Sequence, residues 1–237
     1  LIEGRAMGLP SSPEISRRLR DSYDLDQLYW ETLGLPTGDT KEKPLRELAA
    51  VLEAAGPSYA LIGGMAVQLY SREPRSTKDI DIAVLTFADI PREALERAGF
   101  THEKRYAHSD NWRAPGSGDR KHRVAVQFSA EDVGIPEAVA RAVHTDVDAD
   151  LRLRVVSVPD LALLKLLAAG EASRRHSKRL VDFADVVRLL EEHPELPAAL
   201  PDIRERMSAR LEQRSSHRPS MFMSTQSRNN LSSRVYL

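Results

Sequence analysis

Two aspartates, Asp79 and Asp81, have the residue type and the spacing of metal ligands in the run Asp79-Ile80-Asp81-Ile82. The alternation predicts a β-strand in which both carboxylates point to one face and both isoleucines to the other. The carboxylates would then lie about 7 Å apart and repel each other unless a cation lies between them. Mg²⁺ fits this position, with Mn²⁺ as a substitute, because Mg²⁺ is bound by one or two carboxylates together with substrate phosphates.

A glycine pair stands one predicted helix before these acids. The apolar run 59–62 has the length of a buried strand, and Gly63-Gly64 interrupts it. Apolar residues then recur at helical spacing, so we expect a helix that begins at the glycines. The free backbone N–H groups at the start of a helix favour an anionic phosphate. A phosphate site beside a metal site predicts that the chain binds a nucleoside triphosphate (NTP).

The order Gly63-Gly64, then Arg75-x-Thr77-x-Asp79-x-Asp81, resembles the signature of the DNA polymerase beta-like nucleotidyltransferase superfamily. The spelling is similar to that of the branch that contains the AbiEii-type toxins of bacterial toxin–antitoxin systems. The resemblance implies catalysis and metal binding by both aspartates, and nucleotide binding by both glycines, Arg75 and Thr77. The structural alternative is a tight turn followed by a solvated strand edge.

A second resemblance lies near the C-terminus. Lys165, followed by a basic and acidic helix with Asp182 and Asp185, is similar to the downstream motif of AbiEii-type enzymes. It implies that Lys165 and Asp182 complete the nucleotide pocket. Lys165 stands in an apolar run, where its charge is costly unless it faces a polar cleft. The alternative for the two aspartates is pairing with Arg179 or Arg188 on the helix surface.

The chain departs from the superfamily pattern at Gln127, where a third carboxylate is expected on a later strand. A glutamine carbonyl can bind a metal or a nucleotide, but it carries no charge. Three alternatives follow: weak catalysis, another acid in the missing position, or nucleotide binding without turnover. The acids within reach are Asp110, Asp119, Glu131 and Asp132.

The composition sets the outer limits. The chain has 237 residues, 41% hydrophobic and 29% charged, with a formal net charge of −1. These values suit one large domain or a domain with an appendage. The absence of cysteine excludes thiolate metal sites and favours a cytoplasmic protein. No apolar run approaches the length of a membrane span, and the charge balance argues against a surface dedicated to duplex DNA.

The predicted fold class is α/β (α+β), with a small mixed β-sheet core followed by a C-terminal helical bundle. Residues 1–8 resemble an expression-tag remnant. A helical segment over 9–43, the core over 44–158 and a helical region over 159–213 follow, and 214–237 is predicted to be a disordered or vector-derived tail.

Periodicity and turn residues place the remaining elements. We expect helices over residues 15–33, 44–55, 89–99, 135–143, 160–169, 173–192 and 198–213, and strands over 100–112, 123–129 and 147–155. The last strand is expected to be continuous and half-solvated. In the helix over 173–192, Leu180, Phe183 and Val187 belong to an apolar stripe that we expect to pack.

These expectations combine into one functional hypothesis: transfer of a nucleoside monophosphate from an NTP to a hydroxyl of RNA (tRNA-like) or protein, with Mg²⁺. The resemblance adds a toxin role and a possible antitoxin partner. One alternative is a nucleotide- or partner-binding module with an inactive centre at Gln127. Another is transfer to an aminoglycoside-like small molecule, for which the acidic stretch Asp146, Asp148 and Asp150 is the local hint.

Overall fold

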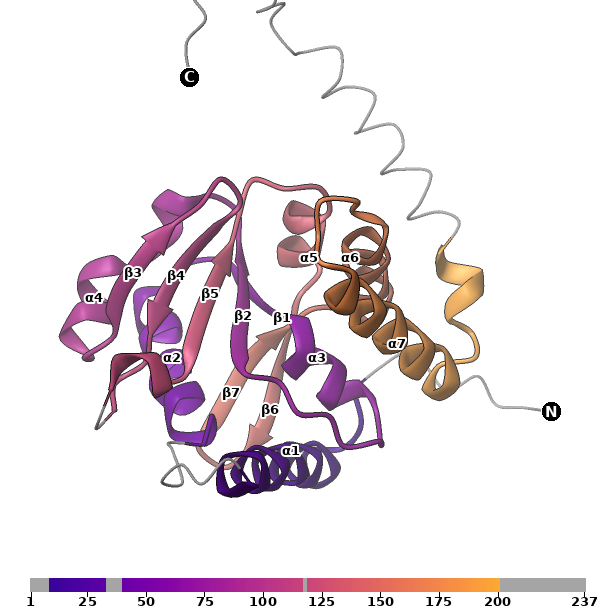
Figure 1. Cartoon of the computed structure of the whole chain (residues 1–237), viewed down its shortest axis with the longest axis horizontal. Coiled ribbons are helices and arrows are strands. Elements are labelled where there is room, and N and C mark those ends of the chain that lie inside the picture. Colours follow the sequence, from indigo (N-terminus) through magenta and orange to yellow (C-terminus); the bar gives the residue numbers. More distant parts are fainter. Residues whose placement is uncertain (1–8, 33–39, 117–118, 201–237) are drawn as a thin grey trace, which may run out of the picture.

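A seven-stranded mixed β-sheet forms the centre of the protein in a computed structural model that describes residues 9–32, 40–116 and 119–200 (Figure 1). The strand order is β3-β4-β5-β2-β1-β7-β6, with parallel pairs β2–β5 and β1–β7 and antiparallel pairs elsewhere. This architecture confirms the predicted mixed α/β class. The strands are β1 Tyr59–Ile62, β2 Asp79–Val84, β3 Thr101–Arg105, β4 Ser109–Arg113, β5 Ala125–Ser129, β6 Val143–Asp148 and β7 Leu151–Val155.

Helices pack against the sheet, and two of them lie beside it. Helix α3 packs on β1 and β2, α1 on β6 and α3, and α2 on β7 and α4. Helices α6 and α7 pack on each other and on α3, to the right of the sheet in Figure 1. The helices are α1 Ser12–Thr32, α2 Glu42–Ala55, α3 Gly63–Tyr70, α4 Arg92–Arg97, α5 Ile135–Ala140, α6 Val158–Gly170 and α7 His176–Glu192, with short 3-10 helices at Phe87–Asp89 and Arg120–His122.

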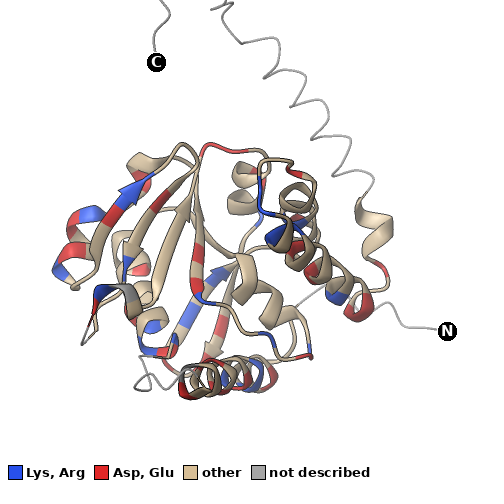
Figure 2. Cartoon of the chain, viewed as in Figure 1, with Lys and Arg blue, Asp and Glu red and all other residues tan. Residues whose placement is uncertain are grey.

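Strand β2 lies in the middle of the sheet, between β1 and β5. The side chains of Ile80 and Ile82 are fully buried, whereas Asp79 and Asp81 on the opposite face are half-buried. Figure 2 shows these acidic positions as bands on β2. The burial agrees with the period of two in the sequence, because a central strand presents one face to each layer of helices.

The predicted single strand over 147–155 is wrong. Residues 143–155 form the hairpin of β6 and β7, with Ala149 exposed at the turn rather than buried. The Asp148 carboxylate accepts the backbone N–H of Asp150 at 3.0 Å, which closes the turn locally. Alternation misled the prediction because the apolar residues keep their period of two through the turn.

Three further elements differ from their predicted bounds. Residues 100–112 form the hairpin of β3 and β4 instead of one irregular strand. Helix α5 ends at Ala140, because residue 143 already begins the edge strand β6. Helix α4 begins at Arg92, since Asp89 belongs to a separate 3-10 turn that it closes with Thr86 in a capping box.

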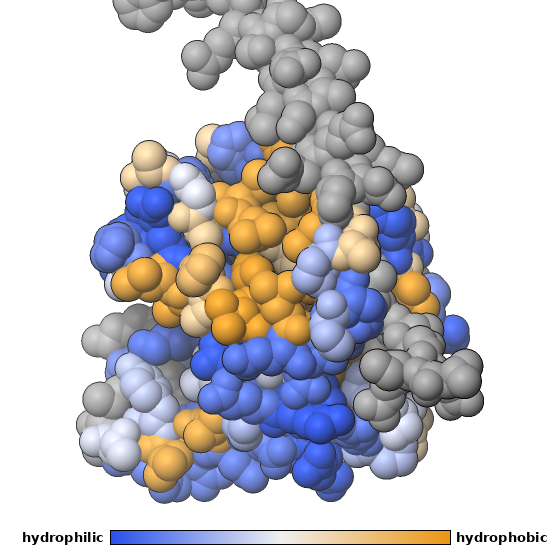
Figure 3. All heavy atoms as spheres, turned by 90° about the vertical axis from the view of Figure 1, so that its right-hand side faces the viewer, coloured by the Kyte–Doolittle hydropathy of each residue, from blue (hydrophilic) through white to orange (hydrophobic). Residues whose placement is uncertain are grey.

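The apolar stripe predicted to pack on α7 is exposed. Leu180 and Phe183 are each 56% exposed and Val187 is 38% exposed, whereas Asp182 and Asp185 on the other face are buried. Figure 3 shows hydrophobic side chains gathered on the side of the molecule where α6 and α7 lie. The inner face of α7 instead combines these two acids with Val186 and Leu189, so the predicted stripe lies to one side of the face that packs.

Some expectations concern parts of the chain outside the described residues. These are the tag remnant over 1–8, most of the helix over 198–213 and the tail over 214–237. Within the described ranges, no helix combines the length and the apolar character needed to cross a bilayer.

Candidate active site

The acid strand and the glycine turn meet directly. A Cβ added to Gly63 would lie 2.6 Å from the Cβ of Asp81 and would overlap its carboxylate, and Gly63 has a φ of +67°. The backbone N–H of Gly64 donates to the Asp81 carboxylate. Glycine is therefore required at residue 63 both for its backbone conformation and for the close approach of the acid. The two halves of the predicted motif face each other.

Arg75 and Thr77 lie against the other glycine. A Cβ at Gly64 would be 2.7 Å from the Thr77 hydroxyl oxygen and would overlap the Arg75 guanidinium. Thr77 thus packs beneath the turn. The Arg75 guanidinium bonds to Asp185 of α7 at 2.6 and 3.0 Å. The side chain of Arg75 thus joins the glycine turn to helix α7.

A cavity of about 530 Å³, the main cavity, opens beside Asp81 and Gly63. Strand β5 contributes Gln127 and helix α6 contributes Lys165. One part of the wall is apolar, since Val133, Ile135, Leu161, Leu164, Leu167 and Ala168 line it. A hollow of this size with an apolar wall and few convergent polar groups is typical of a small-molecule site.

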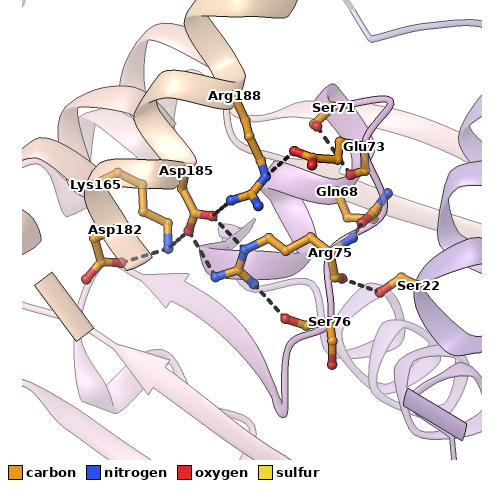
Figure 4. A network of polar contacts seen from close by, with 10 residues as sticks. All are labelled: Ser22, Gln68, Ser71, Glu73, Arg75, Ser76, Lys165, Asp182, Asp185 and Arg188. Atoms are coloured by element: carbon orange, nitrogen blue, oxygen red, sulfur yellow. Dashed lines mark hydrogen bonds and ion pairs between the residues drawn. The ribbon is translucent and has the colours of Figure 1, made fainter. Parts of the chain in front are cut away.

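Lys165 is the centre of a buried ion-pair network between α6 and α7 (Figure 4). Its ammonium lies 2.9 Å from Asp182 and 2.8 Å from Asp185. Arg174 bonds to Asp182 at 2.9 Å, and Arg75 joins the network through Asp185. The exposed fractions of Asp182 and Asp185 are 3% and 0%. Two carboxylates therefore compensate the cost of burying one ammonium at the cavity.

The alternative for these aspartates holds in part: Asp185 does pair with Arg188, but both aspartates are buried rather than on the helix surface. Arg179 donates to the carbonyl of Ala169 instead, and Arg188 lies 3.6 Å from Asp185 while also bonding to Glu73. Both aspartates face the interior because α7 packs with its acidic side toward α6 and the cavity.

Gln127 occupies the position beside Asp81. The two residues are register partners in the parallel β2–β5 pair, and Asn111 of β4 is the next partner across the sheet. Two amide side chains, those of Gln127 and Asn111, therefore follow Asp81 across the sheet. The superfamily pattern predicts a carboxylate at the first of these two positions. The register thus places Gln127 where the superfamily resemblance led us to expect the third carboxylate.

The four acids considered as substitutes lie in different surroundings. Asp132 lines the main cavity, and its carboxylate accepts the backbone N–H of Val133 at 2.7 Å. Asp110 is fully buried with Arg92, Arg105 and His102. Asp119 and Glu131 are exposed and are not among the lining residues of that cavity. Of the four, Asp132 shares the hollow with Asp81.

Asp79 faces a different hollow of about 260 Å³, the second pocket, together with Lys41 and Asp26. Lys41 is 3% exposed, pairs with Asp26 and donates to the carbonyl of Thr77. Burial lowers the pKa of Lys41 to about 7, an effect that the nearby Asp79 carboxylate opposes. No sequence signal pointed to Lys41 or Asp26, because neither belongs to a motif.

The residues present fit a divalent cation that is bound partly by substrate. Burial, and then repulsion by Asp79, raise the pKa of Asp81 to about 6, while Lys165 and Arg75 oppose the shift. Such like-charge repulsion is relieved by a cation between the two carboxylates. In the part of the chain that the structure describes, no group of three or more His, Cys, Asp or Glu side chains surrounds a metal position. Two carboxylates and the Gln127 carbonyl leave further positions to phosphate oxygens, as Mg²⁺ requires.

A comparison with protein families decides the relationship. The sequence model of the family "Nucleotidyl transferase AbiEii toxin, Type IV TA system" matches residues 46–234. The chain belongs to the AbiEii nucleotidyltransferase toxin family. It is therefore a nucleotidyltransferase that uses an NTP, and its family is that of toxins paired with antitoxins. No curated protein sequence matches the chain.

Solved structures with a similar arrangement include three named proteins. An antigenic nucleotidyltransferase-like protein from Paracoccidioides brasiliensis is 18% identical, with a TM-score of 0.43, over 72% of this chain and 93% of its own. The lincosamide antibiotic adenylyltransferase LnuA is 16% identical, with a TM-score of 0.43, over 62% and 97%. JHP933 from Helicobacter pylori is 14% identical, with a TM-score of 0.40, over 74% and 95%. At these values the likenesses say nothing about the substrates of this AbiEii-family chain.

Proposed function

We propose that this AbiEii-family enzyme transfers a nucleoside monophosphate from an NTP to a hydroxyl of RNA and releases pyrophosphate. The observation that carries the proposal is the contact of Asp81 with Gly63 beside a cavity that Lys165 also lines. It unites a phosphate-binding turn, one acid of the pair and a buried cation around one space. The use of NTPs and RNA suits a cytoplasmic site of action.

Each residue has a separate task in this proposal. The N–H groups that begin α3 at Gly63 and Gly64 bind triphosphate oxygens, where a helix N-terminus favours anions. Lys165 neutralises phosphate charge. Asp182 accepts hydrogen bonds from Lys165 and Arg174, so it orients cations toward the cavity. Arg75 and Thr77 act by supporting the glycine turn from below.

Asp79 and Asp81 would hold Mg²⁺, with Gln127 as an uncharged neighbour. The ion supplies charge stabilisation for the transferred phosphoryl group when it is bound. Asp132 is the candidate for the missing acid, because it lines the same cavity as Asp81.

The aminoglycoside alternative loses its local support. Asp146 and Asp148 lie on the edge strand β6, three strands from β2, and Asp148 bonds to Arg46.

Incubation with labelled NTPs, Mg²⁺ and separate pools of cellular RNA and protein tests the proposal. We expect label in RNA, release of pyrophosphate, and loss of both when EDTA removes the metal. Asp79→Asn and Asp81→Asn should each reduce transfer by about a thousandfold, because the transition-state charge loses its metal. Asp150→Asn, in the exposed β6–β7 turn, is the matched control and should transfer normally. Transfer at the wild-type rate by Asp81→Asn would refute the site, and label confined to protein would refute the acceptor.

A further inference from the structure

The second pocket and the main cavity flank the acid pair along the strand direction. The main cavity meets β2 at Asp81, and the second pocket meets it at Asp79, the first residue of the strand. Strand β5 repeats this division: Gln127 and Ser129 line the main cavity, whereas Val124, just before the strand, lines the second pocket. The two hollows therefore approach the acids from opposite ends.

Positive charge dominates the second pocket. Its acids are Asp26 and Asp79, and Asp26 is paired with Lys41. The other basic side chains in the lining are Lys78, Arg113, Arg123 and His122, of which Arg113 also pairs with Glu103 at 3.1 Å. Binding of a metal by Asp79 would add to the positive charge. The ligand that this lining attracts is an anion.

An aromatic ring stands at the same pocket. Tyr29 of α1 is 37% exposed, and the Lys78 ammonium lies 2.8 Å from its hydroxyl and 4.6 Å from its ring centroid. Cations beside an accessible aromatic ring are the combination that binds single-stranded nucleic acid, through phosphate contacts and base stacking. Transfer to a hydroxyl of a protein requires neither the cations nor the aromatic ring.

We propose that the second pocket binds the acceptor as a single-stranded end of an RNA, with a base on Tyr29 and phosphates at Lys78 and the two arginines. This inference rests on the proposed function. In phosphoryl transfer the attacking and leaving oxygens are roughly in line on opposite sides of the phosphorus. An acceptor must therefore reach the acid pair from the side opposite the triphosphate, which is the side of the second pocket.

The residues that line the second pocket also indicate which part of the chain selects the acceptor. Asp26, Tyr29 and Lys41 line it but precede the residues 46–234 that match the family. The NTP side of the site is thus built from the shared family region, whereas the acceptor side includes a segment outside the match. In this proposal the acceptor preference depends in part on helix α1, which contributes Asp26 and Tyr29.

Fluorescence anisotropy with a labelled single-stranded RNA oligonucleotide that has a free 3′-hydroxyl tests the inference. Tyr29→Ala and Lys78→Ala should each weaken binding about tenfold, whereas Tyr29→Phe keeps the ring and should bind as wild type does. Lys78→Ala should also reduce the slope of log K against log salt by about 0.7, the value for one lost phosphate contact. The KM for NTP should stay unchanged in all three variants.

Lys43→Ala on α2 is the matched control, since Lys43 is exposed and is not among the residues lining the pocket. If Tyr29→Ala and Lys78→Ala bind the RNA as tightly as this control, the inference is wrong, and transfer to RNA by the wild-type protein leaves the proposed function standing. If the wild-type protein binds no RNA and labels protein alone, the inference and the RNA acceptor are both wrong, while nucleotidyl transfer remains.

Discussion

Gly63 is required both for the backbone conformation of the turn and for the position of the Asp81 carboxylate. Gly63→Ala introduces a methyl group into the space of the Asp81 carboxylate. We expect the variant to lose at least about a hundredfold in transfer rate, because the displaced acid no longer stabilises the developing charge. Pyrophosphate release under saturating NTP measures this loss.

Gly56→Ala is the control for backbone strain alone. Gly56 has a similar φ of +72° at the end of α2, yet an added Cβ meets nothing within 4 Å. A side chain in this conformation costs about 1–2 kcal/mol. The control should therefore lose stability and keep its activity. Equal activity losses in both variants would show that strain, rather than displacement of Asp81, explains the effect.

Asp110 illustrates an acid with a structural role. Although burial raises its pKa, hydrogen bonds from Arg105 and Arg92 outweigh burial and hold the pKa below its usual value. A depressed folded-state pKa contributes stability above the unfolded pKa of about 4, and this contribution is lost as the pH falls through the folded value. His102 Nε2, 2.9 Å away, adds to this effect when it is protonated.

Asp110→Asn should accordingly lower the free energy of unfolding at pH 7 by about 2 kcal/mol, since charged hydrogen bonds to a buried group are lost. The decline of stability between pH 5 and pH 3 should become shallower, by about the same amount. Urea denaturation across this pH range measures both. Loss of transfer in a variant with unchanged stability would instead indicate that Asp110 is the missing catalytic acid.

At the scale of elements, helix α7 docks through acidic and apolar residues together. Its buried face carries Asp182 and Asp185 beside Val186 and Leu189, whereas Leu180, Phe183 and Val187 are exposed. Helical periodicity was read correctly along the sequence, and the helix was found. Hydropathy failed to identify the inner face because Lys165 and Arg75, which neutralise the acids, come from segments distant in the sequence.

This arrangement predicts that replacing a buried acid of α7 destabilises the protein more than replacing an exposed apolar residue of the same helix. Asp185→Asn should destabilise the protein by about 3 kcal/mol, because Lys165 and Arg75 would lose a buried partner. Phe183→Ser on the exposed stripe should change stability by less than about 0.5 kcal/mol. Urea denaturation of both variants compares the two faces directly. A larger effect of Phe183→Ser would mean that the stripe is the docking face after all.

At the scale of the whole molecule, the N-terminal helix α1 is joined to the catalytic strand. Ser22 donates to the carbonyl of Arg75 at 2.9 Å, and Ser76 donates to Asp26 at 2.9 Å. Lys41 completes this clamp on the residues that directly precede Asp79. The segment outside the family match therefore supports the position of the acid pair.

Asp26→Asn tests this clamp. The buried Lys41 ammonium would lose its counter-charge, so we expect a destabilisation of about 3 kcal/mol and a lower transfer rate at temperatures where the variant is still folded. Asp24→Asn, exposed on the same helix, is the control and should match the wild type in both. Thermal unfolding and pyrophosphate release measure the two effects. Full activity in a destabilised Asp26→Asn variant would limit the clamp to a role in folding.

The sequence by itself determined the features that depend on neighbours along the chain. The strand, glycine turn and helix over residues 59–70 follow from local apolar spacing and from backbone freedom at Gly63. The common face of Asp79 and Asp81 follows from the period of a strand. These local patterns were sufficient to predict the mixed fold, and the enzyme class came from the family resemblance of the motifs that they carry.

Only the tertiary structure decided how distant residues contact one another around the site. Strand register placed Gln127 beside Asp81, and helix packing turned Asp182 and Asp185 inward toward Lys165. The clamp from Lys41 likewise joins segments that are far apart in sequence. Pairing across the sheet and compensation of buried charge depend on the whole packed chain, so no local periodicity encodes them.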